Sequence, residues 1–219
     1  EPCGCALYQM GGLARRSQFL LDRSAARILV ENGGTVKGEL EQDNLKLQTM
    51  LRVFGQLKTD ALNAGWPDLR YGAETLALYA QEGNVPVVAG NLRRADGSAP
   101  FPAFRDVERS GAATRIIGAA ALGPHEQDLA VNGLSLAPPS AAVRDALAKP
   151  WKTRLPHRVV LLSYGTADQL QAQCPDLTGV TVAIVAQEGE APFSVPRRVQ
   201  DVPVLYAGKD GKTLGVAEL

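Results

Sequence analysis

The sequence lacks an excess of charge of either sign, a long hydrophobic run and any internal repeat. Its 23 basic and 23 acidic residues cancel, so the chain carries no electrostatic footprint for nucleic acid or for an anionic membrane. No window approaches the roughly 18 consecutive apolar residues of a membrane span, and we therefore predict no transmembrane segment. Because repeats and low-complexity tracts are also absent, we predict one domain over residues 1–219.

Cysteine is scarce, and it is confined to Cys3, Cys5 and Cys174. Cys3 and Cys5 lie too near each other to bridge easily, so either could pair with Cys174 in an oxidising compartment, or all three could remain thiols. The chain also begins at Glu1 without an initiator Met or an apolar leader. This start predicts that a signal segment was removed or that an upstream piece is absent.

Short apolar runs that end in polar turns predict buried parallel strands. The run Ile28–Val30 breaks at Glu31, Asn32 and two glycines. The runs 157–163 and 180–185 are similar, and each is followed by a turn. In open α/β sheets, ligands bind beyond the carboxyl ends of parallel strands, so these turns are the first place to look for chemistry.

The remaining pattern alternates helices with strands. Apolar steps of three and four predict a long helix from about Leu47 to Leu62, which Gly65 ends before a Trp66-Pro67-Asp68 turn. We expect Ser140 to cap a helix that stops before Pro150. Other expected elements are helices at 13–24, 73–81 and up to Cys174, a strand at 85–89, hairpins at 104–109 with 114–121 and at 202–206 with 213–217 around Asp210-Gly211, a loop at 93–102 and an irregular stretch at 123–138.

Three stretches carry a resemblance to a known family. They are Gly11-Gly12-Leu13-Ala14-Arg15-Arg16 preceded by Glu1-Pro2-Cys3-Gly4-Cys5, the strand Pro86–Leu92, and the final run Tyr206–Leu219. With the order of the elements, they resemble the calcineurin-like metallophosphoesterases, in particular the catalytic domain of the periplasmic 5′-nucleotidase branch and one bacterial extracytoplasmic subgroup of it. The resemblance implies a metallophosphoesterase-like α/β sandwich with mixed sheets, whose first family strand is missing from the chain.

The same resemblance implies that the family's metal site is lost. That family holds two metal ions with Asp, Asn and His ligands, and its Asp-x-His motif would precede Glu1. Gly34 stands where the family has a metal-bridging Asp, and Trp66 and Pro67 stand where it has Asn and His. Tyr164 stands in place of a further His.

The family's last ligand motif is also absent, and the two histidines of this chain do not replace its ligands. The stretch 186–190 replaces Gly-His-x-His, and neither His125 nor His157 falls at a ligand position. The resemblance therefore implies a pseudo-phosphoesterase with no catalytic residues, no metal ligands and no cofactor.

An intact scaffold with an emptied site favours an interaction role. We expect an exported accessory or structural subunit of a larger cell-envelope assembly, with protein partners. Its location would be extracytoplasmic, periplasmic or at the cell surface, and a lipid anchor upstream of Glu1 is compatible with it. Trp66, Trp151 and Phe101 are candidate interface anchors, with core packing as the other interpretation of each.

A divergent metal-dependent phosphoesterase or nucleotidase with a rebuilt site is the alternative. Carboxylate and amide oxygens near the inferred cleft would bind Mg²⁺ or Ca²⁺, unless they are scattered surface groups. The candidates are Glu31, Asp68, Asn91, Glu188 and Glu190.

A third hypothesis is thiol chemistry at Cys3 and Cys5, with Arg15 and Arg16 as cationic neighbours. These arginines lie in the first turn of the predicted helix, where the helix dipole disfavours cations. We therefore expect an outside carboxylate or carbonyl partner for them, or else a solvated face.

Overall fold

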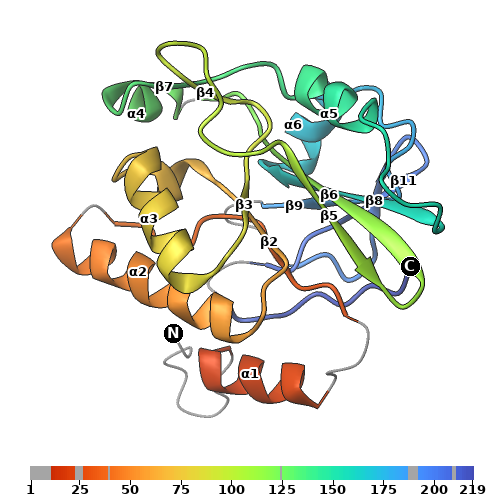
Figure 1. The fold of residues 1–219 in the computed structure, drawn as a ribbon, viewed down its shortest axis with the longest axis horizontal. Helices are drawn as coiled ribbons and strands as arrows, with labels where there is room; N and C mark the ends of the chain where they lie inside the picture. Colours follow the sequence, from red (N-terminus) through yellow and green to blue (C-terminus); the bar gives the residue numbers. More distant parts are fainter. Residues whose placement is uncertain (1–10, 23–26, 39, 124, 187–191, 209–210) are drawn as a thin grey trace.

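Two sheets pack face to face in the structure, a computed structural model that describes residues 11–22, 27–38, 40–123, 125–186, 192–208 and 211–219 (Figure 1). The smaller sheet is parallel, with the order β1 (Val30–Glu31), β2 (Ala61–Asn63), β3 (Val87–Val88). The larger sheet has the order β10 (Arg197–Val199), β11 (Val202–Leu205), β9 (Val182–Val185), β8 (His157–Tyr164), β6 (Ala112–Ala120), β5 (Phe104–Arg109). A separate antiparallel pair joins β4 (Leu92–Arg94) to β7 (Leu134–Leu136).

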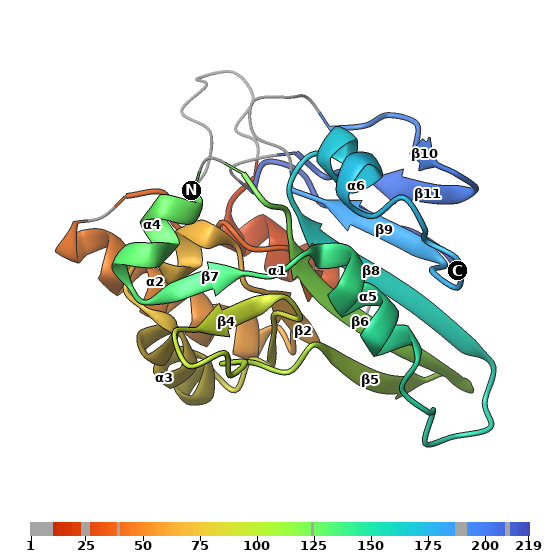
Figure 2. The ribbon, with the colours of Figure 1, turned by 90° about the horizontal axis from the view of Figure 1, so that it is seen from above.

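Six α-helices and one 3₁₀ helix lie around the sheets in the described part of the chain. They are α1 (Leu13–Leu21), α2 (Glu41–Gln56), the short 3₁₀ helix η1 (Trp66–Leu69), α3 (Ala73–Gly83), α4 (Glu126–Val131), α5 (Pro139–Leu147) and α6 (Ala167–Gln173). Figures 1 and 2 show α2 and α3 against the smaller sheet, and α5 and α6 against the larger one. The larger sheet combines parallel pairs with the antiparallel pairs β5–β6 and β10–β11. The predicted α/β architecture with mixed sheets is therefore confirmed.

Apolar cores lie between these layers. Leu47, Leu51 and Phe54 of α2 pack under the smaller sheet. Another core joins the two sheets through residues such as Val88 and Leu162, and a further one lies between the larger sheet and the helices α5 and α6. Among the residues that the structure describes, no helix is both long enough and apolar enough to cross a membrane.

The predicted long helix ends six residues early, at Gln56, and Ala61–Asn63 is the strand β2 instead. The helix terminates because Lys58 adopts a left-handed conformation with φ of 58°. The amide of Thr59 then donates to the carbonyl of Phe54 (3.0 Å), and that of Lys58 donates to Gly55 (2.9 Å). This is the Schellman arrangement, which usually has glycine at the left-handed position. Because lysine stands at this position, the sequence carries no glycine signal for the end of the helix.

The closing hairpin was predicted with the wrong partner. Val202–Leu205 pairs with β10, and the turn between these strands places Gln200 at φ 54°. Residues 213–217 are not in a strand, and Asp210 lies outside the described residues. The turn lacks the Asn-Gly or Asp-Gly signal of a tight hairpin, whereas Asp210-Gly211 has it.

Other corrections concern short elements and boundaries. The irregular stretch at 123–138 contains α4 and β7, and the loop at 93–102 begins inside β4. Ser140 lies inside α5, which begins at Pro139 without a side-chain cap, so proline at the first turn is the start signal. The first strand is Val30–Glu31, shifted from the predicted Ile28–Val30.

Arg115 is the largest fully buried side chain in the described part of the protein. Its guanidinium makes two hydrogen bonds of 2.8 Å with Asp106 and donates to the carbonyls of Ala146 and Lys149. It also lies over the rings of Phe104 and Trp151. The planar guanidinium has five N–H donors in fixed directions and can reach all these acceptors, whereas the three donors of a lysine ammonium group cannot.

We therefore expect the substitution Arg115→Lys to lower the free energy of unfolding by about 2–4 kcal/mol, because several acceptors lose their donors in a buried site. Urea unfolding followed by far-UV circular dichroism measures this loss. The exposed neighbour Arg105 is the matched control, and Arg105→Lys should change stability by less than about 0.5 kcal/mol. Equal losses in both variants would contradict a special role for Arg115.

Candidate functional site

The carboxyl ends of the strands of both sheets meet, and asparagine amides join them. Asn63, the last residue of β2, is fully buried. Its Nδ2 donates to the carbonyls of Ala119 (2.9 Å) in β6 and Leu162 (3.2 Å) in β8. The same nitrogen donates to Oδ1 of Asn32 (2.9 Å). One amide thus ties the smaller sheet to two strands of the larger sheet.

Two further asparagines follow β1 and β3 and act in the same way. Nδ2 of Asn32 donates to the carbonyls of Ser163 (3.1 Å) and Ile184 (2.8 Å). Asn91 donates to the carbonyl of Ala120 (2.7 Å) and accepts from the amide of that residue (2.9 Å). Each of the three parallel strands of the smaller sheet is therefore followed or ended by an asparagine that reaches the larger sheet.

Asp68 organises the turns after β1 and β2. Its buried carboxylate accepts hydrogen bonds from the backbone amides of Gly34 (2.9 Å), Thr35 (2.8 Å) and Gly65 (3.0 Å). Burial raises the pKa of the Asp68 carboxyl above its ordinary value, and the donated hydrogen bonds oppose that rise. The carboxylate is used to hold two loops together.

Tyr164, the last residue of β8, covers the glycines of both turns. A Cβ atom at Gly65 would lie 2.6 Å from its ring, and one at Gly33 would lie 2.8 Å from it. A Cβ atom at Gly34 would lie 3.0 Å from the tyrosine hydroxyl, and the φ of Gly34 is +68°. The phenol ring therefore rests directly on backbone at the positions where side chains would otherwise project.

Glu31 of β1 is also engaged. Its carboxylate pairs with the guanidinium of Arg16 of α1, and both side chains are about four-fifths buried. Burial lowers the pKa of Arg16 to about 10, and Arg16 also lies over the Phe54 ring. Arg15 donates to the carbonyl of Gly11 (2.9 Å). The expectation of an outside carboxylate partner is confirmed for Arg16, whereas the carbonyl that Arg15 contacts lies just before its own helix.

These contacts allow a test of whether the residues fit a pair of metal ions. Asn32 and Asn91 use their amides on backbone groups, Asp68 accepts three amide donors, and Glu31 pairs with Arg16. Within the described ranges, no group of three or more His, Cys, Asp or Glu side chains is placed to hold a metal. Glu188 and Glu190 lie outside those ranges. The described residues do not fit the metal pair that the family resemblance implies.

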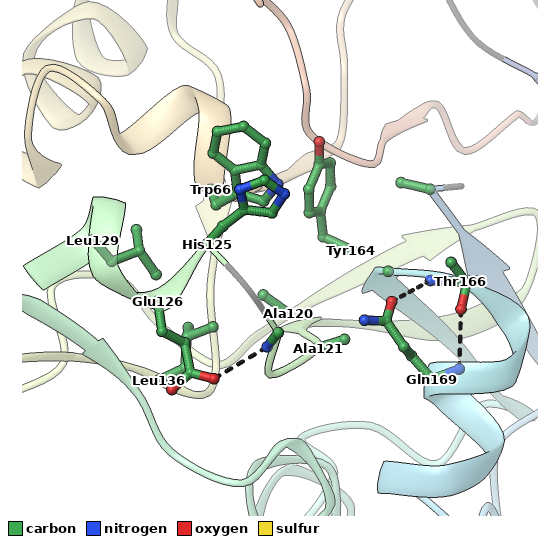
Figure 3. A pocket seen from close by; sticks show the side chains of 13 residues that line it. Trp66, Ala120, Ala121, His125, Glu126, Leu129, Leu136, Tyr164, Thr166 and Gln169 are labelled. Carbon is green, nitrogen blue, oxygen red and sulfur yellow. Dashed lines mark hydrogen bonds between the residues drawn. The ribbon is translucent and has the colours of Figure 1, made fainter. Parts of the chain in front are cut away.

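A pocket of about 190 Å³ opens beside this region, at the carboxyl ends of β6 and β8 (Figure 3). Trp66 and His125 stack on one wall with ring centroids 3.7 Å apart, and Tyr164 lies opposite them. Gln169 and Thr166 form the cap of α6 on another side. The other lining residues are Ala120, Ala121, Gly123, Glu126, Leu129, Leu136, Gly165 and Ala186.

The predicted interface anchors have different surroundings. Trp66 lines the pocket, whereas Phe101 is part of a buried core. Trp151 packs against Arg115 and stacks on His157 with ring centroids 4.0 Å apart. Only Trp66 of the three is therefore placed in the candidate site.

Sequence reasoning missed His125 and Asn63. His125 precedes the short helix α4, in a stretch predicted to be irregular, and its Nδ1 lies 3.2 Å from Asp128. Asn63 was absorbed into the predicted long helix. A polar residue that ends a short apolar run was the signal that could have identified Asn63.

The cysteine hypotheses are tested only for Cys174. It is a free, buried thiol in the core beside α6, and burial raises its pKa to about 11. A thiol with so high a pKa has little reactive thiolate at neutral pH. Cys3 and Cys5 lie outside the described residues.

Comparison with solved structures identifies the fold. The sulfate thiohydrolase SoxB from Thermus thermophilus matches with a TM-score of 0.73 and 17% identity over 93% of this chain. A 5′-nucleotidase precursor, also from Thermus thermophilus, matches with a TM-score of 0.70 and 21% identity over 97% of it. The calcineurin-like phosphoesterase YfkN from Bacillus subtilis matches with a TM-score of 0.70 and 16% identity over 92% of it.

These matches establish the architecture and leave the activity open. This chain spans 39% of the SoxB chain, 47% of the nucleotidase and 74% of YfkN. No protein-family model matches the sequence, and no curated protein sequence matches it. The comparisons confirm that this chain has the metallophosphoesterase-like α/β fold that its motifs predicted.

Proposed function

We propose that this chain is a non-catalytic, metallophosphoesterase-like protein that serves as an accessory or structural subunit of a cell-envelope assembly. The contact of Tyr164 with Gly33, Gly34 and Gly65 carries the proposal. A ligating side chain at position 34 would need the space that the phenol ring occupies. The ring and the glycines are matched to each other and not to an ion.

The polar side chains nearby support the same conclusion. A ligand oxygen or nitrogen needs a lone pair directed at the ion, with room for the ion next to it. Asn63 directs its amide nitrogen at three acceptors of this chain, and Asp68 directs both carboxylate oxygens at backbone amides. These groups stabilise the loops directly, in the way that a bound metal would stabilise its ligand loops.

The proposed location is extracytoplasmic, either periplasmic or at the cell surface. The resemblance of the segment Glu1–Cys5 to an extracytoplasmic subgroup supports it, and a lipid anchor upstream of that segment is compatible with it. Protein partners are proposed because the scaffold keeps a cleft with an aromatic wall, and aromatic side chains are enriched at the centres of protein interfaces.

Metal analysis and turnover test the proposal together. We expect protein purified without chelator to contain no stoichiometric metal by elemental analysis. With added Mn²⁺, it should not hydrolyse 5′-AMP or bis(p-nitrophenyl) phosphate above the rate of the buffer control, because the described His, Cys, Asp and Glu side chains are not grouped to hold an ion.

Stoichiometric metal with turnover that a chelator removes would contradict the proposal. Loss of such turnover in Glu31→Gln, or in Glu188→Gln with Glu190→Gln, would then identify a rebuilt site. Asp145→Asn is the matched control, because Asp145 is exposed on α5 and its substitution removes the same charge.

A double-mutant cycle tests whether the Tyr164 ring fills the space above Gly65. Tyr164→Ala should cost about 3–5 kcal/mol through lost burial and a cavity. Gly65→Ala should cost about 1–3 kcal/mol, since its φ of −82° suits alanine but its new methyl group would strike the ring. In the double variant the clash is absent, so we expect a coupling of about 1–3 kcal/mol by urea unfolding.

Gly123 supplies the control for this cycle. It also lines the pocket, but a Cβ atom there would approach Gln169 and not Tyr164. The substitutions Gly123→Ala and Tyr164→Ala should therefore be additive. Additivity of the Gly65 pair would show that the ring does not occupy this space.

A further inference from the structure

The pocket beside Tyr164 has the size of a site for one side chain. Its volume of about 190 Å³ lies below the roughly 300–1,000 Å³ of pockets for cofactors and other small molecules. Protein interfaces commonly place one anchoring side chain in a small, well-formed pocket of this kind. The occupant is therefore sought among amino-acid side chains.

The chemistry of the wall selects the type of side chain. Trp66, His125 and Tyr164 supply aromatic rings, and alanine and leucine side chains supply apolar surface. Glu126 is the single carboxylate among the described lining residues, and they include no lysine or arginine. Glu126 is exposed at the rim of the pocket, and one of its oxygens accepts from the amide of Gly123 (3.1 Å). The pocket thus combines aromatic rings with one carboxylate, and no lysine or arginine is among its described lining residues.

We infer that this pocket receives an arginine side chain from a partner protein. The methylene stem of arginine suits the apolar wall, while its planar guanidinium stacks on aromatic rings and pairs with a carboxylate. The inference rests on the proposed function, because it assigns a binding role to a cleft that performs no hydrolysis.

The chain itself contains the same combination in occupied form. Arg115 lies over Phe104 and Trp151, 4.2 and 4.3 Å from their ring centres, and pairs with Asp106. The pocket repeats the aromatic rings and the carboxylate, and its described lining includes no lysine or arginine. Arg70 lies over Trp66 at 4.7 Å but is not one of the lining residues.

The two tryptophans allow a direct binding experiment. The full chain is titrated with the peptide acetyl-Gly-Arg-Gly-amide, and the indole N–H signals are followed by NMR. We expect the signal of Trp66 to shift and saturate, while the signal of Trp151, which lies against Arg115 and His157, stays in place. Trp66→Phe and Trp151→Phe assign the two signals.

A charge-only variant and a second peptide decide the outcome. Glu126→Gln keeps an oxygen that can accept from Gly123, so the fold is preserved, and the peptide should bind at least about tenfold more weakly. Asp145→Asn, a change at an exposed acid on α5, should bind as the parent chain does. The inference is overturned if acetyl-Gly-Leu-Gly-amide shifts Trp66 as strongly, if Glu126→Gln binds equally well, or if Trp66 does not shift.

The result is separable from the test of the proposed function. Peptide binding is measured without metal or phosphoester. Failure of the arginine peptide, together with absence of metal-dependent turnover, would overturn the arginine inference alone. Metal-dependent turnover would overturn the proposed function and, with it, the basis of this inference.

Discussion

The buried amide of Asn63 is the contact on which the arrangement of the two sheets depends. Its nitrogen bonds to both β6 and β8 from the end of β2, so it sets the level at which the carboxyl ends of the strands meet. Its Oδ1 is buried without a hydrogen-bond partner among the described residues, and a Cβ atom at Gly118 would lie 2.6 Å from that oxygen. Close approach of the sheets therefore requires an amide at 63 and no side chain at 118.

Neutral side-chain amides provide hydrogen-bond partners for the backbone groups at the strand ends. The ends of parallel strands leave carbonyl and amide groups that need partners when they are buried. Here Asn32, Asn63 and Asn91 supply both donors and acceptors, and they carry no charge whose burial would need a counter-ion. Loops that are closed in this way are held by hydrogen bonds within the chain.

Many of the helices and strands were predictable, because short stretches of sequence indicate them. The strands β8 and β9 were identified from short apolar runs, and the hairpin of β5 and β6 was identified from two runs around a turn. The pairing of β4 with β7 was not, since the two strands are three residues each and about 40 residues apart in the chain. The end of α2 was missed because Lys58 takes a conformation that normally marks glycine.

For the candidate site, the sequence indicated which family ligands are absent. It did not indicate how the residues in their place contact one another. Gly34, Trp66 and Tyr164 were recognised as departures from the family pattern, but their mutual fit depends on distances that only the folded chain supplies. His125 reaches Trp66 from a loop 59 positions later in the sequence. No spacing rule connects two such residues.

The replacements that the resemblance implies at Gly34, Trp66 and Tyr164 are also of a similar chemical kind. Each one exchanges a polar ligand for an aromatic ring or for bare backbone, and the rings are not dispersed but gather around one pocket. Tyr164 fills the space above three glycines, and the Trp66–His125 stack forms a smooth wall beside it. The cleft is therefore closed by packed rings and glycines over most of its area, and it remains open at one small pocket.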